Sequence, residues 1–278
     1  NVKMALAAIR SSKWRSLLTM LGIIIGVVSV VTTISLGEGI KQRIVGQINQ
    51  SGPNLITVRP GRMVTRDAEG NIKSINVMSN FTFGSLSESD FKTVKATPGI
   101  QEAVPFAYVS GIPQRDGLEY TNGPLIATDS GAARLLNQKL EYGVFFDSSD
   151  EEKNVAIIGK RVAEQLFREN VPVGKSFTVR DQTFVVRGVF EEFTTSPLVI
   201  NADYNYAIFI PYASGKHISG GQEQIYQVLA KPNETTSNDL ALKSITAALT
   251  KAHAGQTDFT VLTQEENLAV ANSVLNLL

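Results

Sequence analysis

The hydrophobic pattern divides the chain into one long apolar segment near its start and many short periodic segments after it. The apolar segment, SLLTMLGIIIGVVSVVTTISL, runs from Ser16 to Leu36 without a charged residue. An α-helix rises about 1.5 Å per residue, so a helix of this length spans the roughly 30 Å hydrocarbon core of a bilayer. The pattern therefore predicts a transmembrane helix over residues 16–36.

A cleaved signal peptide and a buried core helix are the alternative interpretations of this segment. A signal peptide has an apolar region of about 7 to 15 residues and a small-residue exit. Here the apolar run is longer and ends in Leu36-Gly37-Glu38-Gly39. A core helix seldom excludes charge for so long, and it seldom carries Trp14 and Arg15 at its edge as an interfacial anchor. Both alternatives fit the pattern less well than a membrane span.

Basic residues flank only one side of the predicted span. Residues 1–36 contain no acidic residue, and their basic residues are Lys3, Arg10, Lys13 and Arg15. By the positive-inside rule, residues 1–15 are cytoplasmic and the chain after the span is outside a cell membrane. We expect an amphipathic segment over residues 1–15 at the cytoplasmic surface. The predicted interface anchors are Arg10, Lys13, Trp14 and Arg15.

Small and apolar residues recur at helical spacing inside and beyond the span. Gly22 and Gly26 form a GxxxG pattern, which lets two helix backbones approach closely. The GxxxG pattern is compatible both with packing on another helix of the same protein and with packing on a second copy of the protein. After the span, Ile40, Ile44 and Ile48 lie four residues apart among polar residues. This stripe predicts a stalk helix over residues 37–53.

A second stalk helix is predicted at the end of the chain, over residues 264–278. Thr263 and Glu266 have capping-box spacing, and leucines follow at helical spacing: Leu268, Leu275 and Leu278. We expect these leucines to face the isoleucine stripe and the two helices to carry motion between membrane and outer domain. Because the apolar run is still rising at the end of the chain, we expect a longer protein that returns into the membrane.

The chain between the stalks predicts a mixed domain of two lobes. Residues 54–110 and 222–263 each have the order strand, helix, strand, and Ser87 and Asp90 form a capping box at the first of these helices. Two such units predict a ferredoxin-like split βαβ lobe. Residues 111–221 form an inserted mixed α/β lobe, so the predicted fold class is α+β.

Several local features of these lobes are also predicted. A tight hairpin turn is expected at Arg180-Asp181 and a helix over residues 160–169. In the helix over residues 236–254, the inward residues are expected to be Leu240, Ile245 and Leu249. Segments 60–80 and 214–221 are rich in Gly, Ser and Asn and are expected to be connecting loops.

Composition removes several classes of function. The 26 Lys and Arg balance the 26 Asp and Glu, which argues against nucleic-acid binding driven by overall charge. The chain has no cysteine. Disulfide frameworks, thiolate zinc sites, iron–sulfur clusters and cysteine nucleophiles are therefore excluded.

No catalytic motif emerges from the sequence. Gly174-Lys175-Ser176 resembles the end of a Walker A motif, but the motif needs glycine where Glu169 stands and a helix where a strand is predicted. His217 and His253 fit no zinc-binding pattern and are expected to be exposed polar residues. We therefore expect no catalytic residue, no metal ligand and no bound cofactor in this chain.

Taken in order, several segments resemble the membrane subunit of MacB-type ABC transporters, a group that includes macrolide exporters, FtsX and lipoprotein-release permeases. They are the basic start and apolar span, LGEG-I, NLITVRPG, VAIIGKRVAEQLF, PVGKSFTVRDQTFVVRGVFEE and AIFIPYAS. The resemblance covers nearly the whole chain. It implies a first membrane helix and a two-lobe extracytoplasmic domain with a ferredoxin-like porter lobe. Three further membrane helices would follow.

The resemblance also implies a function. A permease of this kind couples ATP hydrolysis on a separate ABC ATPase subunit, which binds ATP and Mg²⁺, to movement of an outer domain that handles or exports substrate. Its implied partners are that ATPase, a second permease copy in a homodimer, the lipid bilayer, and an adaptor or outer-membrane protein, with no nucleic acid. The alternative is a singly anchored extracytoplasmic sensor or binding module that recruits a partner protein. In neither case is the chain itself an enzyme.

Overall fold

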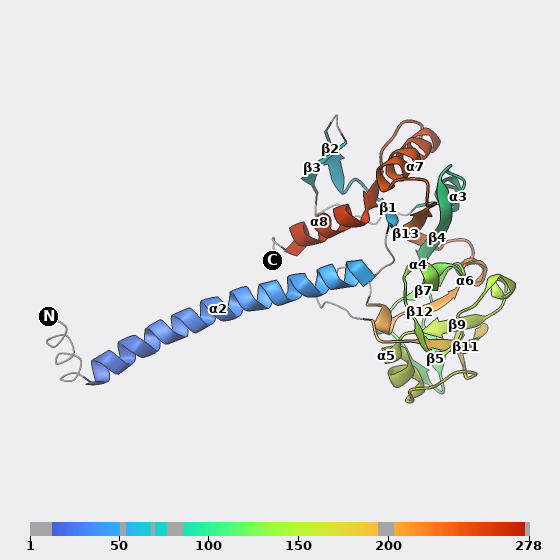
Figure 1. The fold of residues 1–278 in the computed structure, drawn as a ribbon. Coiled ribbons are helices and arrows are strands. Elements are labelled where there is room, and N and C mark those ends of the chain that lie inside the picture. The colour runs from blue at the N-terminus through green and yellow to red at the C-terminus, as the bar shows by residue number, and fades with distance from the viewer. Residues whose placement is uncertain (1–12, 51–53, 68–69, 77–85, 194–202, 276–278) are drawn as a thin grey trace. The chain divides into compact units, whose positions relative to one another are not determined.

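The computed structural model describes residues 13–50, 54–67, 70–76, 86–193 and 203–275 (Figure 1). The chain forms two compact units, Asn1–Arg43 and Ile44–Leu278. A single helix, α2 (Lys13–Gln50), covers the predicted membrane span and most of the predicted stalk. The glycines after the span do not interrupt it. The predicted residues 51–53 of the stalk lie outside the described residues.

The first lobe is a four-stranded antiparallel layer with two helices on it. Its strands lie in the order β14-β1-β13-β4. In each strand–helix–strand unit the two strands are separated by one strand of the other unit, which is the split βαβ arrangement predicted from the sequence. The elements are β1 (Ile56–Pro60), α3 (Glu88–Lys95), β4 (Ile100–Tyr108), β13 (Gln224–Pro232), α7 (Asn238–Ala252) and β14 (Phe259–Thr263).

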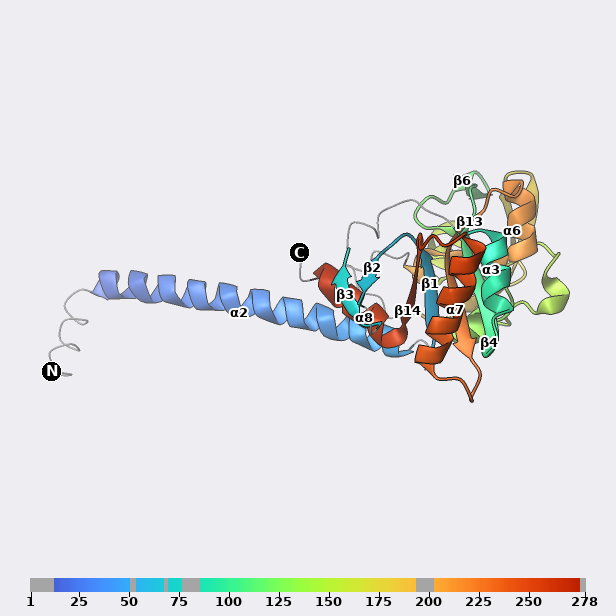
Figure 2. The ribbon, with the colours of Figure 1, turned by 90° about the horizontal axis from the view of Figure 1, so that it is seen from above.

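Helices α3 and α7 lie side by side over one face of this layer (Figure 2). The Ser87 side chain accepts a hydrogen bond from the Asp90 backbone, as the predicted capping box requires. In α7, Ile245 and Leu249 are buried as predicted, but Leu240 is 55% exposed. The buried stripe of α7 starts at Ala241 and Leu242 instead, because one residue turns a helix by about 100° and moves Leu240 off the inner face.

The second lobe continues the same sheet. Within the described residues, the path runs from β4 through β7, β12, β9, β11, β10 and β5 to β6, and β8 pairs with β11. Together with β14, β1 and β13 of the first lobe, the sheet has 12 strands. The strands are β5 (Pro113–Arg115), β6 (Leu118–Glu119), β7 (Leu125–Thr128), β8 (Leu140–Gly143), β9 (Val155–Ile158), β10 (Ser176–Val179), β11 (Gln182–Phe190) and β12 (Ile208–Pro211). The helical elements are α4 (Ala132–Leu135), η2 (Ser148–Asp150), α5 (Lys160–Val162), η3 (Ala163–Phe167), η4 (Tyr204–Tyr206) and α6 (Tyr212–Ser219).

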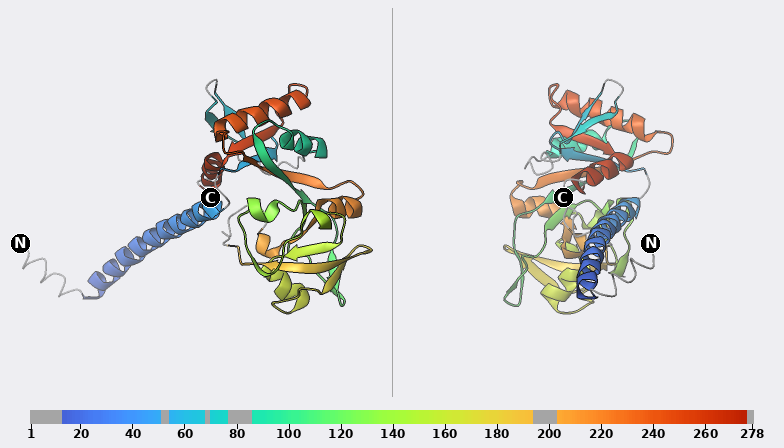
Figure 3. Two further views of the ribbon diagram at one scale, coloured as in Figure 1. Left: turned by 45° about the vertical axis from the view of Figure 1, so that its right-hand side comes forward. Right: turned by 90° about the vertical axis from the view of Figure 1, so that its left-hand side faces the viewer.

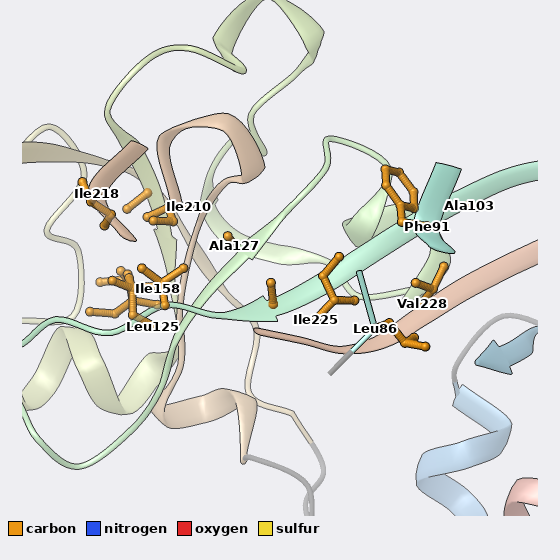
Figure 4. Packing of buried hydrophobic residues seen from close by; sticks show 14 of the residues in the cluster. Leu86, Phe91, Ala103, Leu125, Ala127, Ile158, Ile210, Ile218, Ile225 and Val228 are labelled. Carbon is orange, nitrogen blue, oxygen red and sulfur yellow. The ribbon is translucent and has the colours of Figure 1, made fainter. Parts of the chain in front are cut away.

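The two lobes share strands and core. β4 pairs with β13 along its length, and its last residues pair with β7, with Phe106 opposite Thr128. Buried side chains run without a break from Leu86 and Phe91 past Ile225 to Ile158 (Figure 4). Figure 3 shows the first lobe above and the second below. The predicted lobe boundaries near residues 110 and 222 therefore coincide with strand ends but mark no break in the sheet.

One predicted loop contains a hairpin. Within residues 60–80, β2 (Val64–Arg66) pairs with β3 (Ile72–Ile75). This β2–β3 hairpin lies beside α8 (Gln264–Leu275), with Val64 and Val270 in one small buried cluster (Figure 1). The hairpin was missed because its strands are only 3 and 4 residues long.

The prediction of a loop over residues 214–221 is wrong for most of these residues, because α6 extends through Ser219. The helix ends at Gly220, whose φ of 64° is the left-handed conformation that glycine adopts readily. A Cβ added at Gly215 would collide with the Ala127 side chain on β7. The small residues that mimic a loop composition are therefore the ones that let α6 approach the sheet.

The predicted helix over residues 160–169 is shorter and partly of another type. One α-helical turn, α5, passes directly into the π-helix η3, which ends at Arg168 in the left-handed conformation. Ala163, Leu166 and Phe167 are all buried. Nearby, the predicted tight hairpin is confirmed, since Val179 pairs with Gln182 across Arg180-Asp181.

Candidate functional site

The membrane-length part of α2 presents an open apolar surface. Leu17–Ser35 is the stretch of the described residues that is long and apolar enough to cross a membrane, with a mean hydropathy of 2.5. Its large side chains are exposed, unlike those of a core helix. A Cβ added at Gly22 or Gly26 would meet nothing within 4 Å. The GxxxG face is thus sterically free to receive another helix.

The other membrane and stalk residues predicted from sequence stay predictions. Trp14 is exposed in the first turns of α2, which begins at Lys13 and includes Arg15. Arg10 and Leu278 lie outside the described residues. Ile40, Ile44 and Ile48 are on α2, and Leu268 and Leu275 are on α8. The structure describes the backbone of these residues but not their side chains.

The start of α8 is fixed to the outer domain by polar contacts. The Thr263 Oγ1 accepts from the Glu266 backbone at 3.3 Å, and the Thr263 N–H donates to the Glu266 carboxylate at 3.0 Å, which confirms the predicted capping box. Arg66 of the β2–β3 hairpin donates to both oxygens of Glu266, at 2.5 and 3.0 Å. Asn267 donates to the Thr57 hydroxyl on β1 at 2.8 Å.

We call these residues, Thr57, Arg66, Thr263, Glu266 and Asn267, the α8 anchor. A two-pronged arginine–carboxylate contact fixes orientation as well as distance. Because its members come from β1, β14, the β2–β3 hairpin and α8, any displacement of the first turn of α8 is resisted by the first lobe.

His253 forms a second polar junction, and the expectation that it is an exposed polar residue is wrong. Its side chain is 18% exposed, with Nε2 at 2.8 Å from Asp90 and Nδ1 at 2.5 Å from Asp258. The hydrogen bond to Asp90 raises the pKa of His253, with Asp258 adding to the effect. Burial works against ionisation of Asp90, but hydrogen bonds from Ser87 and His253 hold its pKa below the usual value.

A third polar group lies where β1, β4, β13 and η4 come together. We call Arg59, Tyr108, Tyr204 and Tyr226 the Arg59–tyrosine cluster. The rings of Tyr108 and Tyr226 stack with centroids 4.1 Å apart, and the hydroxyls of Tyr204 and Tyr226 lie 3.1 Å apart. Gln227 donates to the Tyr204 hydroxyl at 3.2 Å. All three tyrosines are only partly buried. They pack against a second cluster of buried apolar residues, separate from the one in Figure 4.

The electrostatics of this cluster are unusual. Burial lowers the pKa of Arg59, against the opposing effect of the three tyrosines. Burial also raises the pKa of Tyr204 to about 12 and raises the pKa values of Tyr226 and Tyr108. The Nε of Arg59 is buried and has no hydrogen-bond partner among the described residues. This grouping could not be predicted from sequence patterns, because the tyrosines are far from Arg59 along the chain.

Nothing in the described residues builds a nucleotide or metal site of a known kind. The residues after Gly174-Lys175 form strand β10, whereas a Walker A loop is followed by a helix. No group of three or more His, Asp or Glu side chains among the described residues is arranged to hold a metal ion.

The architecture defines a class: a ferredoxin-like lobe, continued by a second lobe of the same sheet, in a chain with a membrane-length apolar helix. The chain belongs to the MacB-like periplasmic core domain family, whose model matches residues 16–248. A relative from Rhodospirillum rubrum, named macrolide export ATP-binding/permease protein MacB, is 31% identical over 99% of this chain and 40% of its own length. A protein of the same name from Neisseria meningitidis serogroup A is 30% identical over 92% of this chain and 38% of its own length.

Solved structures agree on the fold. The periplasmic region of MacB from Actinobacillus actinomycetemcomitans matches with a TM-score of 0.63 and 20% identity, over 82% of this chain and 96% of that one. The extracellular domain of the noncanonic ABC-type transporter YknZ from Gram-positive bacteria matches with a TM-score of 0.56, over 75% of this chain and 100% of that one. The resemblance to MacB-type permeases and the α+β fold class are therefore confirmed. The chain spans about two fifths of the length of the curated relatives it matches.

Proposed function

We propose that this chain is the first membrane helix and the extracytoplasmic domain of a MacB-type ABC transporter permease. In this account an ABC ATPase subunit or domain binds and hydrolyses ATP with Mg²⁺ in the cytoplasm. The present chain performs no catalysis. It converts closure of the ATPase into movement of the outer domain, in a cell membrane with residues 1–15 on the cytoplasmic side.

The observation that carries this proposal is the α8 anchor in a chain of this family. A domain that had only to be tethered outside a membrane would need one flexible link. Here the first turn of α8 is capped, paired to Arg66 on both carboxylate oxygens and bonded to β1. A rigid joint of this kind transmits force, whereas an exposed loop would absorb it.

Partners follow from the same account. The open Gly22–Gly26 face supports close packing on a second permease copy in a homodimer or on another helix of the same protein. The relatives named macrolide export ATP-binding/permease protein support an ATPase partner and macrolides as the first substrate to test. An adaptor or outer-membrane protein would receive the substrate where an outer membrane exists.

Reconstituted vesicles test the proposal. The full-length protein with its ATPase, inserted in lipid vesicles, should move a radiolabelled macrolide only when ATP is hydrolysed. A catalytically dead ATPase should abolish the movement. A protein that neither associates with an ATPase nor moves any macrolide would favour the alternative function, a singly anchored sensor or binding module.

A further inference from the structure

The charge of Arg59 has no counter-ion in the part of the chain that the structure describes. The groups that act on it are three tyrosine hydroxyls, and no carboxylate is among them. Of the residues outside the described ranges, only Glu69 is acidic. Arginine stays protonated in proteins, so burial without a partner costs free energy unless something else supplies negative charge.

Arg59 is also unusual among the arginines near it. Arg62 donates to the backbone oxygen and the hydroxyl of Thr257, and Arg66 pairs with Glu266. The buried Nε of Arg59 instead has no hydrogen-bond partner within the described ranges of the chain. Arg59 follows Val58, which pairs with Val228 on β13, the strand that carries Tyr226, and β13 pairs in turn with β4, which carries Tyr108.

The tyrosines supply the second half of a binding site. The stacked rings of Tyr108 and Tyr226 and the ring of Tyr204 form a partly exposed aromatic surface beside the guanidinium. Burial holds the hydroxyls of Tyr204 and Tyr226 in the protonated form. One of the two donates to the other, which leaves one hydroxyl proton for a hydrogen bond to an anion.

We propose that the Arg59–tyrosine cluster binds a ligand that carries a carboxylate next to an aromatic ring. The guanidinium would receive the carboxylate on two parallel N–H donors. The ligand ring would lie against the tyrosines, where aromatic pairs gain roughly 0.5 to 1.5 kcal/mol beyond area burial. This binding does not depend on the proposed transport function. A free small molecule and the C-terminal end of a peptide both present this chemistry.

Ligand-observed NMR titration of the detergent-solubilised chain tests the inference. The probes are N-acetylphenylalanine and its amide, which differ in the carboxylate alone, and a tripeptide with a free C-terminal phenylalanine. We expect the carboxylate probe to bind at least about tenfold more tightly than the amide. If the tripeptide binds more tightly than N-acetylphenylalanine, the site is assigned to the C-terminal ends of peptides. If N-acetylphenylalanine binds more tightly, the site is assigned to small molecules.

Variants separate the site from nonspecific binding. Arg59→Gln should reduce carboxylate binding about tenfold or more, while Arg62→Gln, which removes the same charge three residues away, should leave it unchanged. Arg59→Lys keeps the charge but not the planar guanidinium. We expect it to bind the carboxylate more tightly than Arg59→Gln but less tightly than the wild type, because lysine lacks the two parallel donors. Thermal unfolding of each variant checks that it is folded.

Three results would overturn the inference. They are equal binding of acid and amide by the wild-type chain, undiminished binding by folded Arg59→Gln, and no binding of the carboxylate up to its solubility limit.

Discussion

The Nε2 of His253 lies 2.8 Å from Oδ1 of Asp90, so the C-terminal cap of α7 is tied to the N-terminal cap of α3. The two helices cover the same face of the first lobe. Asp90 is at the same time the third residue of the α3 capping box. One carboxylate therefore stabilises a helix terminus and a contact between helices.

This pair predicts a pH-dependent stability of the outer domain. The folded pKa of His253 is raised, so its contribution is fully present below the unfolded value near 6.5 and is lost as pH rises through the folded pKa. Between pH 6 and pH 9 the wild-type chain should lose about 1 kcal/mol more unfolding free energy than His253→Gln does. Urea unfolding followed by circular dichroism measures this. Parallel pH profiles for the two proteins would contradict the prediction.

The contribution of Asp90 to stability has the opposite pH dependence, because it is lost at low pH. Its folded pKa is lowered, so its contribution is present above its unfolded pKa and is lost as pH falls through the folded one. Asp90→Asn should therefore cost about 1 to 2 kcal/mol at pH 6 and much less at pH 2. The comparison variant is Asp239→Asn, which changes the same charge in the first turn of α7. If Asp239→Asn costs as much as Asp90→Asn, the junction has no special role.

The α8 anchor predicts a local change in exchange of backbone amides. Glu266→Gln weakens the contact with Arg66 and the capping box, so the amides of the first turn of α8 should exchange about tenfold faster. The matched control is Glu265→Gln, because Glu265 is exposed, adjacent and outside these contacts. Hydrogen–deuterium exchange with mass spectrometry measures the exchange of these amides in both variants. Equal protection in both variants would show that the anchor does not hold the helix.

Close approach of α6 to the sheet predicts the effect of a single methyl group. Gly215→Ala should destabilise the chain by about 1 to 3 kcal/mol, because the new Cβ collides with Ala127 on β7. The gain in helix propensity, about 1 kcal/mol, does not offset this. Ala213→Ser on the exposed side of α6 is the control. A stabilised Gly215→Ala variant would mean that α6 moves away from β7 at little cost.

Sequence patterns captured what depends on neighbours along the chain. The split βαβ order, the capping boxes at Ser87 and Thr263 and the turn at Arg180-Asp181 were all predictable, because each is a local signal of a few residues. The β2–β3 hairpin was not, because its short strands gain their stability from packing on α8. The Arg59–tyrosine cluster was not, because residues from four separate elements form it.

The central claim is that α2 and α8 carry motion from the cytoplasmic ATPase to the outer domain. The full-length transporter, with any cysteine outside these 278 residues replaced, is labelled with one spin label per protomer at a cysteine replacing the exposed Glu234. The present chain has no cysteine of its own. Electron–electron double resonance then measures the distance between the two outer domains of a homodimer, with and without ATP and vanadate. Ile44→Pro is compared with Ile44→Ala, because proline removes a helical hydrogen bond and costs roughly 3 kcal/mol or more. We predict that the wild type and Ile44→Ala change distance on trapping ATP, whereas Ile44→Pro hydrolyses ATP but keeps one distance. The same distance change in Ile44→Pro would contradict the account and leave the helix as a spacer.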